Sequence, residues 1–309
     1  MTVYNGCMTT DFRSGYVAIV GKPNVGKSTL LNRYLGQKVA AVSPRPQTTR
    51  RRQLGILTSE QSQLIFIDTP GMHQPKYALG KFMNDEATTA LLDADVVVCL
   101  VDASQPPDSD DRLLTERIAA LQPSPPMILA LNKVDLVKAE DMERRRAEYQ
   151  ALLPAAWLLP LSAQNGLGCN RLLAAILERI PPGPVFFDAD QVTDFFERDI
   201  AADLVREAAL YHLREEVPHG IAVRVDGYTE RGDTGAEIAM TIFVERESHK
   251  GIVIGKGGLM LKKIGTAARQ EIEAMSGRKV FLELRVKVEA DWRNKPNSLR
   301  QFGYFQEED

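Results

Sequence analysis

The segment that most constrains this chain is Gly21-Lys22-Pro23-Asn24-Val25-Gly26-Lys27-Ser28. It fits G-x-x-x-x-G-K-[ST], a loop whose backbone N–H groups surround phosphate oxygens. The apolar residues 16–20 before it predict a buried strand, and the apolar spacing in residues 30–35 after it predicts a helix. Because strand, loop and helix are the context that this motif requires, the sequence predicts a site for a phosphate-bearing nucleotide.

The residues of this loop have distinct chemical roles. Gly21 and Gly26 allow the backbone to curl, and the helix that begins near Lys27 directs its positive dipole end at the phosphates. Lys27 is expected to reach the β- and γ-phosphates, and the Ser28 hydroxyl is expected to hold Mg²⁺. Asn24 is a candidate ligand for K⁺ beside the β- and γ-phosphates; the alternative is that Asn24 only caps the loop.

The composition is that of a soluble globular protein long enough for about two domains, with 309 residues, 26% charged and 44% hydrophobic. The net charge of −3 means that any nucleic-acid surface must be a local patch. Three widely spaced cysteines favour a reducing, intracellular setting. No apolar run approaches the roughly 20 residues that span a bilayer, and residues 1–15 lack the apolar core of a signal peptide. We expect residues 1–15 to form a disordered or extended N-terminal extension.

A polar loop over residues 37–52 carries the next candidate metal ligand. Pro44 and Pro46 exclude a helix there. A threonine in such a loop can bind Mg²⁺ only while a γ-phosphate is present, which would make the loop an order–disorder switch. Thr49 is the first candidate and Thr48 the second. The three arginines at 50–52 are expected to form a solvated face rather than a binding site.

Strands are predicted at 54–58, 64–67, 96–102 and 127–131, and the second of them ends in Asp68-Thr69-Pro70-Gly71. Asp68 is expected to hold Mg²⁺ through water, and the Gly71 N–H to contact the γ-phosphate. With Lys27 and Thr49, Gly71 completes the predicted catalytic set. Met72 follows where many GTPases carry a glutamine that orients the attacking water, so intrinsic hydrolysis is expected to be slow.

The motif Asn132-Lys133-Val134-Asp135 after the strand 127–131 predicts which base is bound. The Asp135 carboxylate can accept two hydrogen bonds, from guanine N1–H and from the 2-amino group. Adenine offers neither donor and would leave a carboxylate unpaired, at a cost of about 1–3 kcal/mol or more. Asn132 is expected to tie this strand end to the phosphate loop, and the Lys133 stem to cover the base. Ser162-Ala163 would add a backbone N–H to the guanine carbonyl.

These motifs fall at the ends of successive apolar strands that alternate with predicted helices at 111–121 and 170–180. That order predicts a mostly parallel, doubly wound sheet with its ligands at the carboxyl ends of the strands. Pro181-Pro182-Gly183-Pro184 ends the last helix and cannot continue regular structure. We therefore predict a nucleotide domain over 16–183 and a second domain over 184–309.

The second half predicts a different order of elements: helix 199–216, strands 221–225 and 238–244 with a turn at 232–235, a helix, Gly255-Lys256-Gly257-Gly258, helix 259–275 and strand 280–288. Gly-x-x-Gly between two helices is the nucleic-acid clamp of a KH domain. Positions 248–270 contain five basic residues and no acid, which favours a phosphate backbone as the ligand. The alternative is a solvated helix face beside a turn. The predicted RNA-binding residues are Lys250, Gly255, Lys256, Gly257, Gly258, Lys262 and Lys263. Residues 291–309 are expected to pack as a short helix.

Together, the five nucleotide motifs and the Gly-x-x-Gly loop resemble the Era family of bacterial GTPases over nearly everything after residue 15. The resemblance implies an α/β, doubly wound P-loop GTPase domain followed by an α+β type II KH domain. It implies hydrolysis of GTP to GDP with Mg²⁺, GTP-dependent binding of single-stranded RNA near the 3′ end of 16S rRNA, and a role in assembly of the small ribosomal subunit. It also implies a cytoplasmic protein that can associate with the inner face of the membrane, although no sequence feature independently indicates membrane binding. We expect a monomer.

Two other functions fit parts of the sequence. One is an RNA-binding adaptor in which the bound nucleotide is structural and is never turned over. The other is an RNA-modifying enzyme, but the second half shows no pair of carboxylates and no Cys/His set suited to that chemistry. Multiple turnover stimulated by RNA would separate the GTPase from the adaptor.

Overall fold

The computed structural model describes residues 12–232 and 235–305, which form two compact units. Unit 1 comprises the described residues of 12–35, 53–69 and 88–194, and unit 2 comprises 36–52, 70–87 and 195–305. Most of the predicted N-terminal extension, part of the predicted turn at 232–235 and the last four residues of the predicted tail lie outside the described residues.

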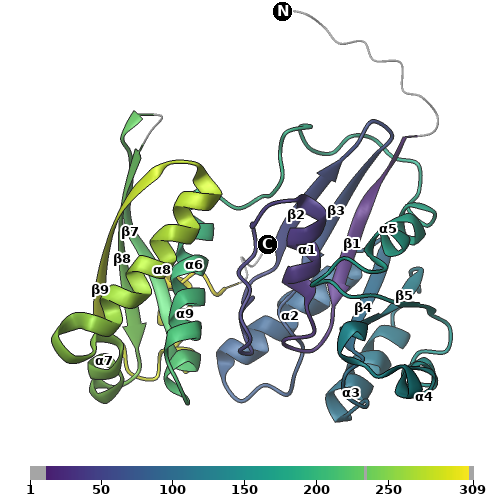
Figure 1. The fold of residues 1–309 in the computed structure, drawn as a ribbon, viewed down its shortest axis with the longest axis horizontal. Helices are drawn as coiled ribbons and strands as arrows, with labels where there is room; N and C mark the ends of the chain where they lie inside the picture. Colours follow the sequence, from purple (N-terminus) through teal and green to yellow (C-terminus); the bar gives the residue numbers. More distant parts are fainter. Residues whose placement is uncertain (1–11, 233–234, 306–309) are drawn as a thin grey trace, which may run out of the picture. The chain divides into compact units, whose positions relative to one another are not determined.

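Unit 1 is built on a six-stranded sheet in the order β2-β3-β1-β4-β5-β6 (Figure 1). Its strands are β1 (Arg13–Val20), β2 (Gln53–Thr58), β3 (Ser62–Asp68), β4 (Val96–Asp102), β5 (Met127–Asn132) and β6 (Trp157–Pro160). β2 pairs antiparallel with β3, and the other neighbours pair in parallel. β3 is buried along its whole length, as expected of a strand covered on both faces. The predicted doubly wound sheet is confirmed.

Helices flank this sheet (Figure 1). They are α1 (Lys27–Leu35), α3 (Ser109–Ala119), α4 (Ala139–Gln150), α5 (Cys169–Leu177) and the last part of α2 (Ala78–Leu92), whose first part belongs to unit 2. α1 lies beside α5, because the Tyr34 hydroxyl donates to the Cys169 carbonyl at 2.9 Å. α2 and α4 were not predicted. In α4 the one buried side chain is Tyr149, so its sequence carries no apolar stripe to reveal the helix.

Unit 2 contains the three-stranded sheet β7-β8-β9. Its elements are β7 (Ala222–Glu230), β8 (Gly235–Val244), β9 (Lys279–Val288), α6 (Glu197–His212), α7 (Glu247–Ile254), α8 (Leu259–Ser276) and α9 (Pro296–Gln301). The predicted order of helices and strands is confirmed. α6 ends at His212 rather than Glu216, because the backbone becomes extended at Leu213, Glu215 is left-handed and Pro218 follows.

The two faces of this sheet are covered differently. One face packs against α6 and α8 in a core that includes Leu204, Ile242 and Ile264. The neighbouring β8 residue, Phe243, points to the opposite face because side chains alternate along a strand. There it packs with Phe302 and other side chains of the C-terminal segment and α2. The C-terminal helix α9 is therefore part of the core of unit 2.

The 36–52 loop also belongs to unit 2, and its arginines correct one prediction. Arg50 does not lie on a solvated face: it is only 2% exposed. Its guanidinium donates to the Ile221 carbonyl at 2.6 Å and the His219 carbonyl at 3.1 Å, and it lies over the Trp292 ring. Burial lowers the pKa of Arg50. Arg52 is exposed, as expected.

A second buried arginine holds the same loop from α6. Arg206, also 2% exposed, donates to the Gln47 carbonyl at 2.9 Å and to the Thr48 carbonyl. Its own neighbour Asp203 forms an ion pair with it at 2.8 Å. The next residue of α6, Glu207, accepts from the Val42 N–H at 2.9 Å. The loop is therefore bound to unit 2 through its backbone.

Candidate functional site

The phosphate loop has the conformation that its glycines predict. Asn24 and Gly26 have φ values of 64° and 104°. A Cβ on Gly26 would lie 2.3 Å from Asn132 Nδ2, and a Cβ on Gly21 would lie 2.3 Å from the Leu100 carbonyl oxygen. Since real Cβ atoms do not approach so closely, both positions require glycine, and the loop has the tight curl of a phosphate cradle.

Asn132 connects this loop to the base-recognition strand, as predicted. It is 2% exposed, and its Nδ2 donates to the Val25 carbonyl at 2.6 Å. Its Oδ1 accepts from the Ala163 N–H at 2.8 Å. One amide side chain therefore joins the phosphate loop, the end of β5 and the segment after β6. The phosphate and base ends of the site cannot shift independently.

Lys27 lies inside the cradle, 6% exposed. Its Nζ donates to the Gly21 carbonyl at 3.0 Å and to the Lys22 carbonyl at 2.9 Å. Burial lowers the pKa of Lys27 to about 8, against the opposing effect of the Asp68 carboxylate. An ammonium held in this way has lost its water, so a phosphate oxygen that reaches it gains a strong charge-assisted hydrogen bond.

The two predicted Mg²⁺ ligands of unit 1 meet. The Ser28 hydroxyl donates to Asp68 Oδ2 at 2.7 Å, and Asp68 is fully buried at the end of β3. The neighbouring Thr69 hydroxyl donates to the Ile19 carbonyl at 2.9 Å, which fixes the strand end. Within the described residues no group of three His, Cys, Asp or Glu could hold a metal. This oxygen pair fits Mg²⁺, which commonly takes one or two protein oxygens and completes its shell with phosphate and water.

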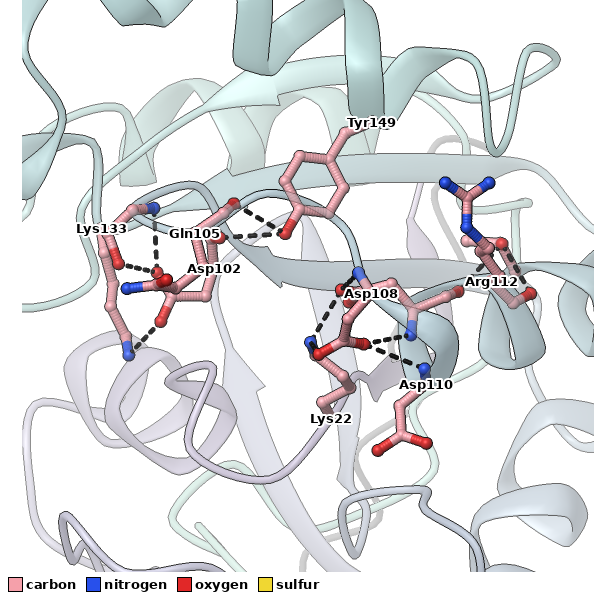
Figure 2. Close-up of polar contacts among 11 residues, drawn as sticks. Lys22, Asp102, Gln105, Asp108, Asp110, Arg112, Lys133 and Tyr149 are labelled. Atoms are coloured by element: carbon pink, nitrogen blue, oxygen red, sulfur yellow. Dashed lines mark hydrogen bonds and ion pairs between the residues drawn. The ribbon is translucent and has the colours of Figure 1, made fainter.

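Lys22, a predicted nucleotide-binding residue, directs its side chain toward α3 instead. Its ammonium lies 2.7 Å from carboxylate oxygens of Asp108 and Asp111, at the N-terminal cap of that helix (Figure 2). Burial alone would lower the pKa of Lys22, but these hydrogen bonds raise it. The side chain therefore anchors the phosphate loop to α3, and the backbone of Lys22 is the part that faces the cradle.

At the base end, Asp135 lies on the short helical turn Val134–Leu136 and is exposed. Its carboxylate makes no hydrogen bond or ion pair with the described part of the chain. Lys133 has a left-handed backbone, φ 63°, and its ammonium lies 2.6 Å from Asp102 Oδ2. Figure 2 shows this pair beside the Tyr149 hydroxyl, which donates to the Asp102 carbonyl at 3.0 Å. A carboxylate that has no partner among the described residues, next to a held lysine stem, suits guanine recognition.

In the segment after β6, some backbone N–H groups already have hydrogen-bond partners within the protein. Ser162 and Ala163 are buried; the Ala163 N–H donates to Asn132 and the Ser162 N–H donates to the Leu167 carbonyl at 2.8 Å. Their contact with the guanine carbonyl stays a prediction. The next N–H, that of Gln164, makes no hydrogen bond within the described residues. It is therefore a further candidate donor for that carbonyl, one that the sequence did not single out.

Three other predicted residues, Thr49, Gly71 and Met72, belong to unit 2. Thr49 follows the Thr48 carbonyl that Arg206 holds, and the Thr48 hydroxyl donates to the Arg45 carbonyl at 2.9 Å. The Gly71 carbonyl lies 3.0 Å from His73 Nδ1. Met72 is 4% exposed, so it presents no polar group for a water. The catalytic roles of Thr49 and Gly71 stay predictions.

The Gly-x-x-Gly loop forms a second candidate site, within unit 2. Gly255 has φ 72°, and a Cβ there would lie 2.7 Å from Met260 Cβ, so the sharp turn between α7 and α8 needs glycine. In the helical turn Lys256–Gly258, the Gly258 N–H donates to the Gly255 carbonyl at 3.1 Å. Lys256, Lys262 and Lys263 are exposed, and Lys250 is near Glu247 at 4.0 Å.

A cleft of about 370 Å³ runs beside this loop, between α8 and β9, and we call it the RNA cleft. Two of the predicted RNA-binding residues, Gly258 and Lys262, line it; their contact with RNA stays a prediction. Sequence reasoning missed Thr266 as a lining residue and left Arg269 out of the binding set. Arg269 follows Lys262 by two helical turns and Thr266 by one, which places all three on the same face. Leu282 and Leu284 of β9 form an apolar wall. Apolar wall, basic rim and a glycine loop suit a single-stranded nucleic acid.

Comparisons with known proteins agree with both sites. Residues 16–133 match the family described as 50S ribosome-binding GTPase, and residues 216–293 match the KH domain. GTPase Era of Ruminiclostridium cellulolyticum is 45% identical over 294 residues, which cover 95% of this chain and 98% of that protein. GTPase Era of Heliobacterium modesticaldum is 42% identical and covers 94% of this chain and 97% of its own length.

A solved structure matches over nearly the same length. A crystal structure of Era in complex with MgGDPNP and nucleotides 1506–1542 of 16S ribosomal RNA is 41% identical. Its TM-score is 0.90, over 95% of this chain and 99% of that one. Separately, among the helices of the described residues, none combines the length and the apolar character needed to cross a membrane.

Proposed function

The chain belongs to the Era family of GTPases, and we propose that it is a GTP-hydrolysing switch that binds 16S rRNA near its 3′ end and acts in assembly of the small ribosomal subunit. The observation that carries this proposal is the Asn132 bridge. It joins a phosphate cradle to the Asp135 turn, and so builds a guanine nucleotide site in a chain that also has an RNA cleft. The related Era structure with MgGDPNP and 16S rRNA nucleotides supports both ligands.

The hydrolysis reaction is attack of water on the γ-phosphate. Lys27 and the backbone N–H groups of the phosphate loop stabilise the negative charge that develops on the phosphate oxygens. Ser28 and Asp68 would hold Mg²⁺, which supplies further charge neutralisation between the β- and γ-phosphates. Because Met72 is buried and apolar, this chain supplies no side chain there to orient the water, and slow intrinsic turnover follows.

We infer that the 36–52 loop couples the two ligands. Thr49 is expected to bind Mg²⁺ when the γ-phosphate is present, while Arg206 on α6 holds the adjacent backbone. α6 packs against α8, the helix that lines the RNA cleft, in one core. A change of loop position driven by GTP therefore reaches α6 by direct contact, and GTP would favour the state in which the RNA cleft is open.

Other parts of the proposal rest on the family. We propose functional domains over 16–183 and 184–309, a monomer in the cytoplasm, and a peripheral association with the inner face of the membrane. The small subunit is the proposed partner particle. K⁺ at Asn24, beside the phosphates, is the proposed accessory ion.

The test is GTP turnover by the purified chain, with and without a single-stranded RNA that matches the 3′ end of 16S rRNA. We expect tight RNA binding with GTP, weaker binding with GDP, and faster turnover when RNA is present. A matched control is the same RNA with its sequence scrambled. Turnover that ignores RNA, together with equal RNA affinity in GTP and GDP, would favour the adaptor instead. A chain that binds neither guanine nucleotide nor RNA would overturn the proposal.

A further inference from the structure

A second cavity of unit 2 lies at the opposite edge of the three-stranded sheet from the RNA cleft. It has a volume of about 360 Å³ and lies against β7, the first turns of α6 and the segment Gln301–Gly303. We call it the edge cavity. The RNA cleft is walled by β9, and the sheet order is β7-β8-β9. Two strand spacings, about 10 Å, therefore separate the two edges.

Three guanidinium groups line the edge cavity, and two of them have no carboxylate partner. Arg51 lies 4.9 Å over the Phe195 ring, and Arg198 lies 5.0 Å over the Phe196 ring. Neither forms an ion pair within residues 12–232 and 235–305. An aromatic face orients a guanidinium but does not neutralise it, so both keep their hydrogen-bond donors for a ligand.

The third guanidinium and the acids limit the charge that the cavity can accept. Arg224 forms an ion pair with Asp226 at 2.7 Å, and Asp226 also accepts from the Thr241 hydroxyl. Those two charges cancel. Among the other charged residues of the lining, Asp199 carries one negative charge, and Arg51 and Arg198 carry two positive charges. The unpaired side chains therefore carry one net positive charge, which matches a phosphodiester with one negative charge better than a free phosphate with about two.

The rest of the lining suits a nucleotide. Val223 and Val225 give the lining apolar surface. Phe196 is outside the lining, but its ring is 66% exposed and lies against Arg198, which is part of it. An exposed aromatic ring next to an arginine is a stacking platform for a base. Asp199 can accept a hydrogen bond from a ribose hydroxyl or a base amino group. The volume lies within the range of about 300–1,000 Å³ that is usual for small-ligand sites.

We propose that the edge cavity binds one nucleotide of the single-stranded RNA, beyond the segment held by the RNA cleft. Arg51 and Arg198 contact its phosphodiester, and Phe196 stacks on its base. This inference rests on the proposed function, because it extends the same RNA chain. It also gives the RNA a contact with Arg51, which lies in the loop that carries Thr49.

The test compares two RNAs by fluorescence anisotropy, one just long enough for the RNA cleft and one extended at both ends. Wild type is expected to bind the longer RNA about tenfold more tightly, as stacking of one base provides. Arg198→Ala and the double variant Arg51→Ala/Arg198→Ala are expected to lose that gain, and the salt slope for the longer RNA is expected to fall by about one. Binding of the short RNA is expected to stay unchanged. The control is Arg285→Ala, an exposed arginine of β9 paired with Glu283.

The outcomes separate this inference from the proposed function. Equal affinity of wild type and variants for the longer RNA, with normal binding of the short one, overturns the edge-cavity inference alone. No binding of either RNA by wild type overturns the proposed function as well. Inorganic phosphate or GMP that binds at this cavity in the absence of RNA, and needs Arg198, would make it a site for a free anion and would overturn the RNA assignment. Unchanged melting temperature of Arg198→Ala excludes misfolding as the cause of a loss.

Discussion

The phosphate loop and the 36–52 loop each depend on a buried cation, but the two cations have different partners. Lys27 is held by carbonyls of its own loop, within a few residues in the chain. Arg206 comes from α6 and holds carbonyls 158 and 159 residues away. The carbonyl partners of Lys27 do not neutralise its charge, so this ammonium is available to a ligand. The second is neutralised by Asp203 and completes a packed structure.

This difference distinguishes buried charges that bind a ligand from buried charges that stabilise the fold. Burial lowers the pKa of Lys27 to about 8, so the fold holds its ammonium at a cost that a bound phosphate would offset. Burial acts on Arg206 too, but the Asp203 carboxylate more than compensates and its pKa is raised. A cation that the fold leaves under-stabilised indicates a ligand site. Four experiments can test this contrast.

The largest effect is expected for Lys27→Ala. Removal of a desolvated ammonium from a phosphate site costs about 2–5 kcal/mol, so affinity for GTP and GDP should fall by at least about 30-fold. The measurement is titration with a fluorescent guanine nucleotide, with the exposed lysine variant Lys138→Ala as the control. RNA binding without nucleotide is expected to persist. If nucleotide affinity stays at the wild-type level, Lys27 only stabilises the fold, as Arg206 does, and the proposed difference between the two cations is wrong.

Arg206→Ala should act on the loop and leave the phosphate site intact. Loss of two backbone hydrogen bonds and of a buried ion pair costs about 2–4 kcal/mol locally. The Val42 amide, which donates to Glu207 in the same loop, should then exchange with deuterium much faster. Asp203→Asn keeps the guanidinium and should show a smaller effect. Nucleotide affinity that falls as far as in Lys27→Ala would show that both cations serve the same site.

The pH dependence of binding distinguishes the two cations further. The pKa of Lys27 is lowered to about 8 in the free protein, whereas a bound phosphate stabilises the ammonium and raises it again. Above about pH 8 nucleotide binding must therefore take up a proton, and affinity should fall by up to tenfold per pH unit. The measurement is GDP affinity from pH 7 to 9.5. Lys27→Arg stays charged in this range and should give a flat profile; parallel profiles would contradict the assignment.

The smallest effect concerns the proposed K⁺ at Asn24. If its left-handed backbone places the side chain beside the phosphates, turnover should be several-fold faster in K⁺ than in Na⁺ buffer. Asn24→Ala should remove that difference without the collapse of affinity expected for Lys27→Ala. Equal wild-type rates in the two salts would leave Asn24 as a cap of the loop.

Much of unit 1 could be predicted because its signals are local. The phosphate motif, Asp68 and the Asn132 motif each follow an apolar strand, and parallel strands carry such residues to one sheet edge. The order of elements around Gly255–Gly258 was equally readable from apolar spacing. α4 could not be found, because it buries a single side chain and shows no stripe.

The 36–52 loop shows where sequence reasoning ends. A run of three arginines in a polar loop is usually solvated, and nothing local marks Arg50 as different from Arg52. Its burial depends on Ile221, His219 and Trp292, which are distant in sequence. The side chain of Lys22 is a similar case: the motif leaves its direction open, and only the fold shows that the cap of α3 supplies two carboxylates for it.

The docking of Arg50 also has a consequence for how the protein is made. Its carbonyl partner at Ile221 is synthesised 171 residues after it, and the aromatic ring of Trp292 later still. Through most of translation the 36–52 loop therefore has no surface to pack against. Contacts between residues so far apart in the chain also form slowly. The segment that carries Thr49 reaches its place only when the C-terminal core has formed. The newly made chain would thus order the 36–52 loop last, together with the C-terminal core of unit 2.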